Sequence, residues 1–541
     1  MPAGPDVRTP DDTTDAVASF DGLFRRAARA TPDAPALVQG DRRLSWSEVD
    51  AAVDRTAAGY AARGLAAGDR VAVQLPNGVD WVLAVVGALR AGLVVVPVNP
   101  AYTDPELEHL LTDSGARLVV ATQERTGPAG VPVLAGPPES DDAPPAPPSD
   151  ASALALLAYT SGTTGRPRGA MLTHAALLTN QRQVLAVEPA PVRPGDVVLL
   201  VLPLFHVYGL NGGLGLTAAT GACGVLVDAF DPVSSLELMA AEGVSAVPGA
   251  PPMYQAWLAA ADHTGSDTAL RRAFAAVHTA SCGAAPLPAR VWTAMRDRAA
   301  VTVWEGYGLT EAAPVLATTL VTGRAKPSCI GAPVPGVELV LRDTAGGPGA
   351  GPDPGSKVRE DVFGDPWGDD PPDSAGEVCV RGANLFSGYW PDGADGPDDE
   401  GWLVTGDIAY RDAVGDLHLV DRRRDLVLVS GFNVYPGEVE RVLDAHPEVA
   451  EAAVIGVPDD RTGESVRAVV VRTPGSQVDV QTLRTFAARS LARFKVPSSV
   501  RFVDQLPHSL TGKVSRARLR ELGLDRMAAE TQEVEGVTRG D

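Results

Sequence analysis

Cysteine is scarce in this chain of 541 residues, and the four that occur lie far apart, at Cys223, Cys282, Cys329 and Cys379. They form no Cys-x-x-Cys pair. We therefore expect neither structural disulfides nor a zinc site, and a reducing, cytoplasmic location is predicted.

Basic residues are also in the minority, with 46 Lys and Arg against 68 Asp and Glu and a formal net charge of −22. A nucleic-acid partner would need an excess of Lys and Arg to neutralise phosphates, so none is expected. Binding of ATP stays compatible with this charge, because it needs only a local anion site.

Neither a signal peptide nor a membrane-spanning helix is predicted. The start, MPAGPDVRTPDDTTDAV, has no basic region followed by an apolar core. Residues 197–227 carry no Asp, Glu, Lys or Arg, but Pro203, His206 and Asn211 interrupt the run. We expect a buried strand, a loop, a helix and a second strand there.

Helical and strand patterns alternate along the first part of the chain. Expected helices span 44–63, 81–91 and 105–114, and expected strands span 69–75, 93–98 and 118–122. Such alternation predicts an α/β fold with βαβ units in layered, largely parallel sheets. Two stretches rich in Gly, Pro and Asp, 127–148 and 343–375, are predicted as surface loops.

The pattern changes near Arg424, where short strands (452–456 and 468–471) and one helix (480–492) predict a compact α+β unit. We therefore predict a large N-terminal domain over 1–423, a small mobile C-terminal domain over 424–524, and a disordered tail over 525–541.

One segment has the composition of a phosphate-binding loop. An apolar strand from Leu156 runs into TSGTTGRPRG, and a helix capped near Thr173 is expected after it. Glycines allow the backbone N–H groups to approach phosphate, hydroxyls add donors, and Arg168 adds charge. The segment is not a Walker A loop, since the only Gly-Lys pair, Gly512-Lys513, is followed by Val514. The predicted nucleotide contacts here are Thr160, Ser161, Gly162, Thr163, Thr164, Gly165 and Arg168.

This run resembles the phosphate loop of the adenylate-forming superfamily, which includes acyl-CoA synthetases, peptide-synthetase adenylation domains and luciferases. The family usually has Lys where this chain has Arg168, and Arg keeps the charge as a planar fork. Further motifs follow in the family's order. SCGAAPL at 281–287 resembles the adenine-binding turn, and EGYGLTE at 305–311 resembles the segment that contacts adenine, phosphate and Mg²⁺.

The resemblance implies roles for individual residues. Glu311 and Thr160 would hold Mg²⁺, since a hard cation prefers carboxylate and hydroxyl oxygen. The other implied ATP contacts are Gly283, Ala284, Ala285, Glu305, Gly306, Tyr307, Gly308, Thr310, Asp407 and Arg422. Arg424 would be the hinge between the domains, and Ser430, Gly431 and Phe432 in SGFNVYP would line the CoA tunnel of the acyl-CoA synthetase branch. Lys513, Glu311 and His206 are the implied catalytic residues.

The implied acyl site is apolar. Segments 204–209 and 247–254 contain its residues Val207, Tyr208, Gly249 and Ala250, and neither segment has an Arg or Lys for a second carboxylate. The resemblance thus implies an ATP-dependent acyl-CoA synthetase that uses Mg²⁺ and CoA, with a medium- or long-chain fatty acid as substrate. The alternatives are an acyl-AMP ligase that loads a carrier protein, an aryl-CoA ligase, and a nucleotide-binding regulator without catalysis. A homodimer is left open.

Overall fold

The computed structural model describes residues 17–160, 167–342, 375–422, 427–429, 432–459, 463–491, 493–508 and 514–520. Clustering of contacts divides the chain into two compact units. The first contains Met1–Val340, Cys379–Thr405 and Gly415–His418, and the second contains the rest. The predicted boundary at 423/424 stays a prediction, because Arg423 and Arg424 lie outside the described residues. So do residues 343–374 of the predicted insertion 343–375, and the predicted tail 525–541.

A seven-stranded sheet in the first unit has the order β6-β7-β5-β3-β4-β8-β9. Its strands are β3 (Arg70–Val73), β4 (Val94–Pro97), β5 (Leu118–Ala121), β6 (Arg125–Thr126), β7 (Pro132–Ala135), β8 (Leu154–Thr160) and β9 (Arg168–Thr173). β3 pairs in parallel with both β4 and β5. Helices α3 (Val79–Arg90) and α4 (Asp104–Ser114) connect these strands, which confirms the predicted βαβ units.

The prediction of a surface loop over 127–148 is wrong in its first part. Residues Pro132–Ala135 form β7, which pairs in parallel with β5 and buries Val133. The short apolar run from Val131 to Leu134 was outweighed by the Gly and Pro residues around it. Four residues suffice here because they extend an existing sheet and bury one side chain in its core.

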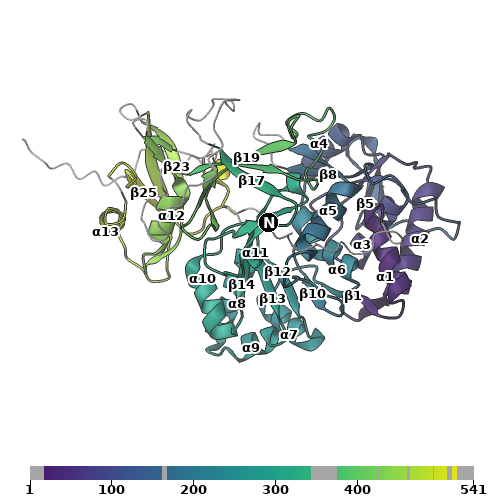
Figure 1. The fold of residues 1–541 in the computed structure, drawn as a ribbon, viewed down its shortest axis with the longest axis horizontal. Coiled ribbons are helices and arrows are strands. Elements are labelled where there is room, and N and C mark those ends of the chain that lie inside the picture. The colour runs from purple at the N-terminus through teal and green to yellow at the C-terminus, as the bar shows by residue number, and fades with distance from the viewer. Residues whose placement is uncertain are drawn as a thin grey trace, which may run out of the picture. The chain divides into compact units, whose positions relative to one another are not determined.

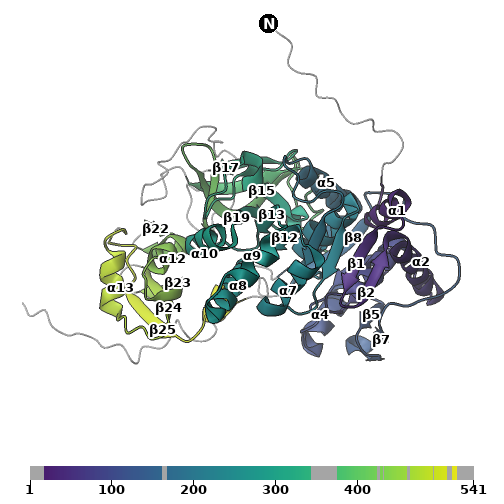
Figure 2. The same cartoon turned by 90° about the horizontal axis from the view of Figure 1, so that it is seen from below.

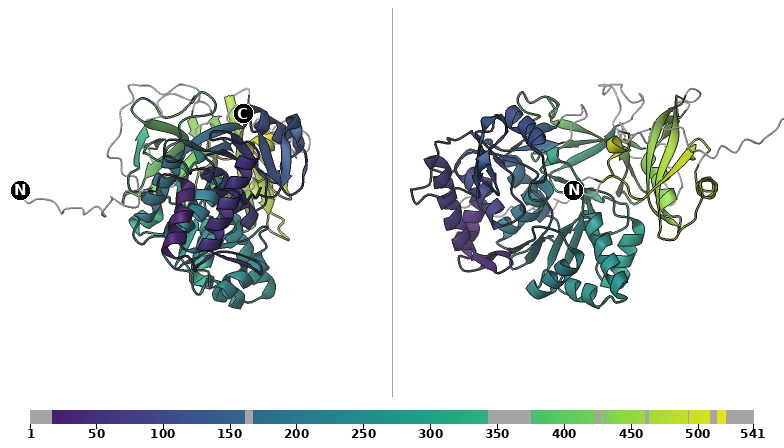
Figure 3. Two further views of the ribbon diagram at one scale, coloured as in Figure 1. Left: turned by 90° about the vertical axis from the view of Figure 1, so that its right-hand side faces the viewer. Right: turned by 180° about the vertical axis from the view of Figure 1, so that it is seen from behind.

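Helices α1 (Phe20–Ala30), α2 (Trp46–Ala62) and α3 pack beside this sheet, and the purple helices lie side by side in Figure 3. The helix predicted over 44–63 is confirmed as α2, and Ser45 caps its first turn in a capping box with Glu48. Arg90 of α3 is fully buried among carboxylates of α1 and α2, with ion pairs to Asp50 at 2.6 Å and Asp54 at 2.9 Å. A buried guanidinium is tolerated because these partners offset its lost hydration.

A nine-stranded sheet also lies in the first unit, with the order β16-β15-β14-β13-β12-β10-β11-β1-β2. Its strands are β1 (Pro35–Gln39), β2 (Arg42–Ser45), β10 (Val197–Leu200), β11 (Cys223–Leu226), β12 (Ala246–Gly249), β13 (Thr279–Cys282), β14 (Val303–Gly308), β15 (Val315–Thr318) and β16 (Ala332–Pro333). The strands from β1 to β14 in this order pair in parallel. Residues 197–227 form β10, the helical segments η2 (Tyr208–Gly215) and α6 (Leu216–Thr220), and β11, as predicted.

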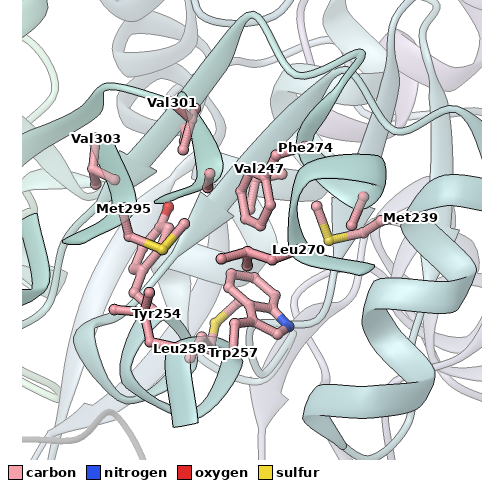
Figure 4. Packing of buried hydrophobic residues seen from close by; sticks show 14 of the residues in the cluster. Met239, Val247, Tyr254, Trp257, Leu258, Leu270, Phe274, Met295, Val301 and Val303 are labelled. Carbon is pink, nitrogen blue, oxygen red and sulfur yellow. The ribbon is translucent and has the colours of Figure 1, made fainter. Parts of the chain in front are cut away.

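An aromatic core stabilises one face of this sheet. Helices α7 (Pro232–Glu242), α8 (Pro251–Thr264) and α9 (Thr268–Phe274) gather beside β12 and β13 (Figures 1 and 2). Trp257 of α8 packs edge-on against Tyr254 and Phe274, with ring centroids 5.5 and 5.4 Å apart (Figure 4). Its indole N–H donates to Ser235 Oγ at 2.8 Å, so the buried polar atom is satisfied.

Two smaller sheets follow along the chain. The first contains β17 (Glu338–Arg342), β18 (Gly376–Arg381), β19 (Trp402–Arg411) and β20 (Leu417–Arg422), in that order. The second has the order β22-β21-β24-β23, with β25 paired to β24. Its strands are β21 (Val427–Val429), β22 (Phe432–Val434), β23 (Val449–Asp459), β24 (Gly463–Arg472) and β25 (Ser499–Val503).

The second sheet and the helices α12 (Pro436–Asp444) and α13 (Val480–Ala487) share a core of Val, Ala and Leu, and they form an α+β unit of the predicted kind. The predicted helix over 480–492 is too long, since α13 ends at Ala487 and hydrogen-bonded turns then keep Leu491 buried. The α/β fold class, with a large N-terminal and a smaller C-terminal part, is confirmed. Throughout the described ranges, every helix is too short or too polar to cross a membrane.

Candidate active site

A hairpin presents the phosphate loop. β8 and β9 run antiparallel, and their last register pair joins Thr160 to Arg168. The loop residues Ser161, Gly162, Thr163, Thr164 and Gly165 lie outside the described residues, so their contacts stay predictions. The sequence predicts a helix directly after the loop, but strand β9 lies between the loop and that helix. Helix α5 (His174–Leu185) then begins with Thr173 as its N-cap, as predicted, and the Thr173 hydroxyl accepts from the backbone N–H of Ala176.

The two predicted metal ligands, Thr160 and Glu311, meet around Tyr389, a residue that the sequence motifs did not indicate. The hydroxyl of Tyr389 donates to Glu311 Oε1, and the Thr160 side chain also hydrogen-bonds this phenol. Burial, followed by the negative charge of Glu311, raises the pKa of Tyr389 well above its usual value. The phenol therefore keeps its proton and acts as a donor at neutral pH.

The donor set fits a magnesium ion accompanied by phosphate. Glu311 and Thr160 provide carboxylate and hydroxyl oxygens. Within the described ranges, no three His, Cys, Asp or Glu residues gather as a ready-made metal site. Mg²⁺ commonly takes one or two protein oxygens and completes its octahedron with water and substrate phosphates. Glu311 and Thr160 are therefore residues that could hold it.

Arg168 lies on the other side of the same tyrosine. Its guanidinium carbon is 4.0 Å from the centroid of the Tyr389 ring, and its Nη1 is 2.6 Å from Asp395 Oδ2. The Asp395 side chain is 70% exposed, so solvent and salt weaken this ion pair. The guanidinium is thus available to a stronger anion. Tyr389 lies 221 residues after Arg168 in the chain, so no local pattern indicated this contact.

The predicted adenine turn begins where β13 ends. Gly283 donates its N–H to the Gly249 carbonyl at 3.1 Å, and Ala284 adopts a φ of +71°, a value that few non-glycine residues take. Ala285 completes the turn, and Gly249 ends the neighbouring strand β12. Both segments lie at the carboxyl ends of parallel strands, where α/β sheets commonly bind ligands.

Glu305, a predicted ATP contact, accepts a hydrogen bond from the backbone of this turn. Its side chain is 4% exposed, and its two oxygens accept from the backbone N–H groups of Leu287 at 3.0 Å and Ser328 at 2.9 Å. Burial raises the pKa of Glu305 to about 8 despite these two donors. The carboxyl group therefore has a direct part in positioning the turn.

The EGYGLTE segment continues along β14 into a short helical turn. Gly306 and Tyr307 pair with β15, and Tyr307 is buried. A Cβ on Gly308 would lie 2.0 Å from the Pro314 carbonyl oxygen, so only glycine fits there. Thr310 and Glu311 follow in the 3-10 turn η4 (Thr310–Ala312) at the end of the strand.

The predicted acyl-site residues surround Tyr208. Its hydroxyl is 3.4 Å from the Gly249 carbonyl and 3.5 Å from Ser281 Oγ, and its backbone N–H donates to His206 Nδ1 at 3.3 Å. A Cβ on Gly283 would come within 3.0 Å of the Tyr208 ring. Val207, which precedes Tyr208, and Ala250, which follows Gly249, are both buried. The structure thus brings the predicted acyl residues and the adenine turn together.

The remaining predicted residues belong to the second unit. Asp407 is buried in β19. For Arg422 and Phe432 only the backbone is described, in β20 and β22, and Arg424, Ser430, Gly431 and Lys513 lie outside the described residues. Their roles in binding ribose and CoA, in the hinge and in catalysis stay predictions.

Comparison with known proteins agrees with this arrangement. The family described as AMP-binding enzyme matches residues 24–390, and its C-terminal domain family matches residues 438–513. A feruloyl-CoA synthase from an Amycolatopsis species is 37% identical over 509 residues, covering 92% of this chain and 97% of that protein. A long-chain-fatty-acid–CoA ligase from Escherichia coli is 33% identical, covering 92% and 93%.

A solved structure extends the likeness to the whole fold. ATP-bound MatB from Rhodopseudomonas palustris superposes with a TM-score of 0.80 at 31% identity, covering 94% of this chain and 99% of that one. Both family domains match in this order and together cover most of the chain. The chain belongs to the AMP-binding enzyme family of the adenylate-forming superfamily, and it is an ATP-using, AMP-forming acid–thiol ligase.

Proposed function

We propose that this chain activates an apolar carboxylic acid as its adenylate and then transfers the acyl group to CoA. The observation that carries the proposal is the set of side chains around Tyr389. Thr160, Glu311 and Arg168 offer two kinds of oxygen ligand and one cation around this tyrosine, and Thr160 and Arg168 flank the predicted phosphate loop in the sequence. Negative charge that develops when phosphorus is attacked is stabilised by a metal ion and by positively charged side chains.

In the first half-reaction a carboxylate oxygen of the acid attacks the α-phosphorus of ATP, and the bond to the bridging oxygen of pyrophosphate breaks. Arg168 and the loop hold the leaving pyrophosphate, while Lys513, by prediction, contacts the α-phosphate and the acid. Glu311 and Thr160 would hold Mg²⁺, which would supply positive charge to offset that of the phosphates. In the second half-reaction the thiol of CoA loses its proton to solvent and its sulfur attacks the acyl carbonyl carbon. The bond from this carbon to the phosphate oxygen breaks, and AMP leaves.

The residues around Tyr208 limit which acids can bind. The sequence predicts a medium- or long-chain fatty acid, and the relative named as a long-chain-fatty-acid–CoA ligase supports it. Packing limits the room on one side of Gly249. A Cβ on Gly249 would lie 2.9 Å from the Tyr254 ring, which is fully buried and belongs to the aromatic core (Figure 4).

Because that core is close-packed, the space on the Tyr254 side of Gly249 is filled, so an acid bound beside Tyr208 cannot extend in that direction. A flat aromatic acid needs less length and stacks well on the Tyr208 ring. The relative named as a feruloyl-CoA synthase supports this second class. We therefore propose an aromatic acid first and a fatty acid of medium length second. Transfer to a carrier protein is the alternative for the acceptor.

The test is pyrophosphate release with ATP and a panel of benzoate, hydroxycinnamates, hexanoate, decanoate and palmitate, followed by thioester formation with CoA or a carrier protein. We expect a hydroxycinnamate to exceed palmitate in kcat/KM by about tenfold or more. Gly249→Ala should lower the rate with every acid, because the new methyl group meets Tyr254. A preference for palmitate would reject the aromatic acid, and no pyrophosphate release with any acid would reject the activity.

A further inference from the structure

Residues 386–390 connect the strand of Arg168 with the segment of Glu311. Ser387 and Trp390 donate their N–H groups to the carbonyls of Met171 and Gly169 at 2.9 and 2.8 Å. The N–H of Phe386 donates to the Glu311 carbonyl at 2.9 Å. The same short segment therefore hydrogen-bonds with β9 on one side and with the candidate metal ligand on the other.

Tyr389 repeats this connection with its side chain. Its hydroxyl contacts Glu311 and Thr160, while its ring lies beneath the guanidinium of Arg168. Phe386 packs edge-on against the ring, with centroids 5.1 Å apart, and limits its rotation. One side chain thus contacts both candidate metal ligands and the candidate phosphate cation.

We propose that Tyr389 is a positioning residue for magnesium–ATP: its hydroxyl orients the Glu311 carboxylate toward the metal, and its ring orients Arg168 toward the phosphates. This inference rests on the proposed function. The role assigned to Tyr389 is exerted through Glu311 and Arg168.

The physical reason lies in the geometry of the two groups. A donor on Glu311 Oε1 leaves Oε2 free for a cation and fixes the plane of the carboxylate. Outer partners of this kind commonly contribute tenfold or more to metal affinity. A guanidinium stacked on an aromatic ring keeps its N–H edge free for an anion, so stacking and phosphate binding are compatible.

The experiment measures ATP binding by calorimetry, without acid or CoA, as a function of Mg²⁺. Tyr389→Phe removes the hydroxyl and keeps the ring. We expect the Mg²⁺ concentration for half-maximal effect to rise about tenfold, while the affinity for ATP in EDTA changes by less than about twofold. Tyr389→Leu removes the ring as well, so it should also weaken metal-free ATP binding by about threefold.

Tyr159→Phe is the matched control, since Tyr159 is a partly buried tyrosine whose hydroxyl donates to another carboxylate, Asp113, at 2.5 Å. It should leave the Mg²⁺ dependence as in the wild type. In a Glu311→Gln background, Tyr389→Phe should have no further effect on Mg²⁺, because the carboxylate it orients is gone.

An unchanged Mg²⁺ dependence in Tyr389→Phe would overturn the inference, as would an equal shift in Tyr159→Phe. Tyr389→Leu provides the same test if Tyr389→Phe folds poorly. Wild-type pyrophosphate release separates this result from the proposed function. If the wild type is active and Tyr389→Phe has the wild-type Mg²⁺ dependence, only the positioning role is rejected. An inactive wild type rejects the function itself.

Discussion

Asp395 pairs with the guanidinium that is predicted to bind the phosphates of ATP. Asp395 pairs with Arg168 at 2.6 Å, and its exposed carboxylate adds negative charge where polyphosphate is expected to bind. Asp395→Asn should therefore lower the Kd for ATP by about threefold, in keeping with the small energy of an exposed ion pair. The difference should shrink at high salt.

Calorimetric titration of both proteins with ATP at low and high salt measures this effect. Asp392→Asn is the control, because Asp392 lies in the same exposed turn and its side chain accepts from the Ala394 N–H. An equal gain in Asp392→Asn would show a general charge effect and contradict the competition at Arg168.

Glu305 should make the stability of the first unit depend on pH. Burial raises its pKa from 4.5 to about 8, so the folded state binds a proton that the unfolded state has released between these values. Its contribution to stability is therefore full below pH 4.5 and is lost as pH rises to about 8. For one proton the slope is at most about 1.4 kcal/mol per pH unit.

Denaturant unfolding at pH 5 and pH 8 tests this dependence. Glu305→Gln should flatten the profile, since its side chain does not titrate, and should lower stability at pH 5 by about 1–3 kcal/mol through loss of one backbone contact. Glu338→Gln, at an exposed position of β17, should retain the wild-type slope. A Glu305→Gln profile as steep as that of the wild type would assign the slope to another group.

At the scale of the element, the turn after Phe386 depends on one glycine. Gly388 has a φ of +87°, and a Cβ there would lie 2.0 Å from the Gly393 carbonyl oxygen. Gly388→Ala should therefore displace Tyr389 from Glu311 and cost about 1–3 kcal/mol of stability. As expected for Tyr389→Phe, the Mg²⁺ concentration for half-maximal effect on ATP binding should rise.

Gly136→Ala is the control that separates backbone strain from displacement of Tyr389. Gly136 has a similar φ of +77°, but nothing lies within 4 Å of the added Cβ. It should lose stability through backbone strain alone and bind magnesium–ATP normally. If Gly388→Ala binds magnesium–ATP like Gly136→Ala, the turn has no part in the site.

At the scale of the whole molecule, the two half-reactions should need different residues. By resemblance, Lys513 serves adenylation and then leaves as the C-terminal domain rotates. Lys513→Ala should reduce pyrophosphate release by about 10²–10³-fold, yet keep thioester formation from preformed acyl-adenylate and CoA. Lys357→Ala, in the predicted 343–375 insertion, removes an equal charge and should affect neither step. Equal losses in both half-reactions of Lys513→Ala would reject alternation.

Many features follow from the sequence alone. The alternation of apolar helices and strands predicts the βαβ units, Ser45 and Thr173 mark helix starts, and the ordered motifs identify the superfamily. These features are local, because a cap, a periodicity or a motif is determined by neighbouring residues. The strand β7 was missed because its short apolar run acquires meaning only when β5 is beside it.

Only the tertiary structure decided how the site residues are supported. Tyr389 and Glu311 are 78 residues apart, and Arg168 and Asp395 are 227 apart, so no local pattern reports these contacts. The role of Glu305 also depended on folding, since burial and two backbone donors from separate segments determine its pKa. The sequence names the residue types that the chemistry needs, whereas long-range packing determines which of them meet and in which protonation state.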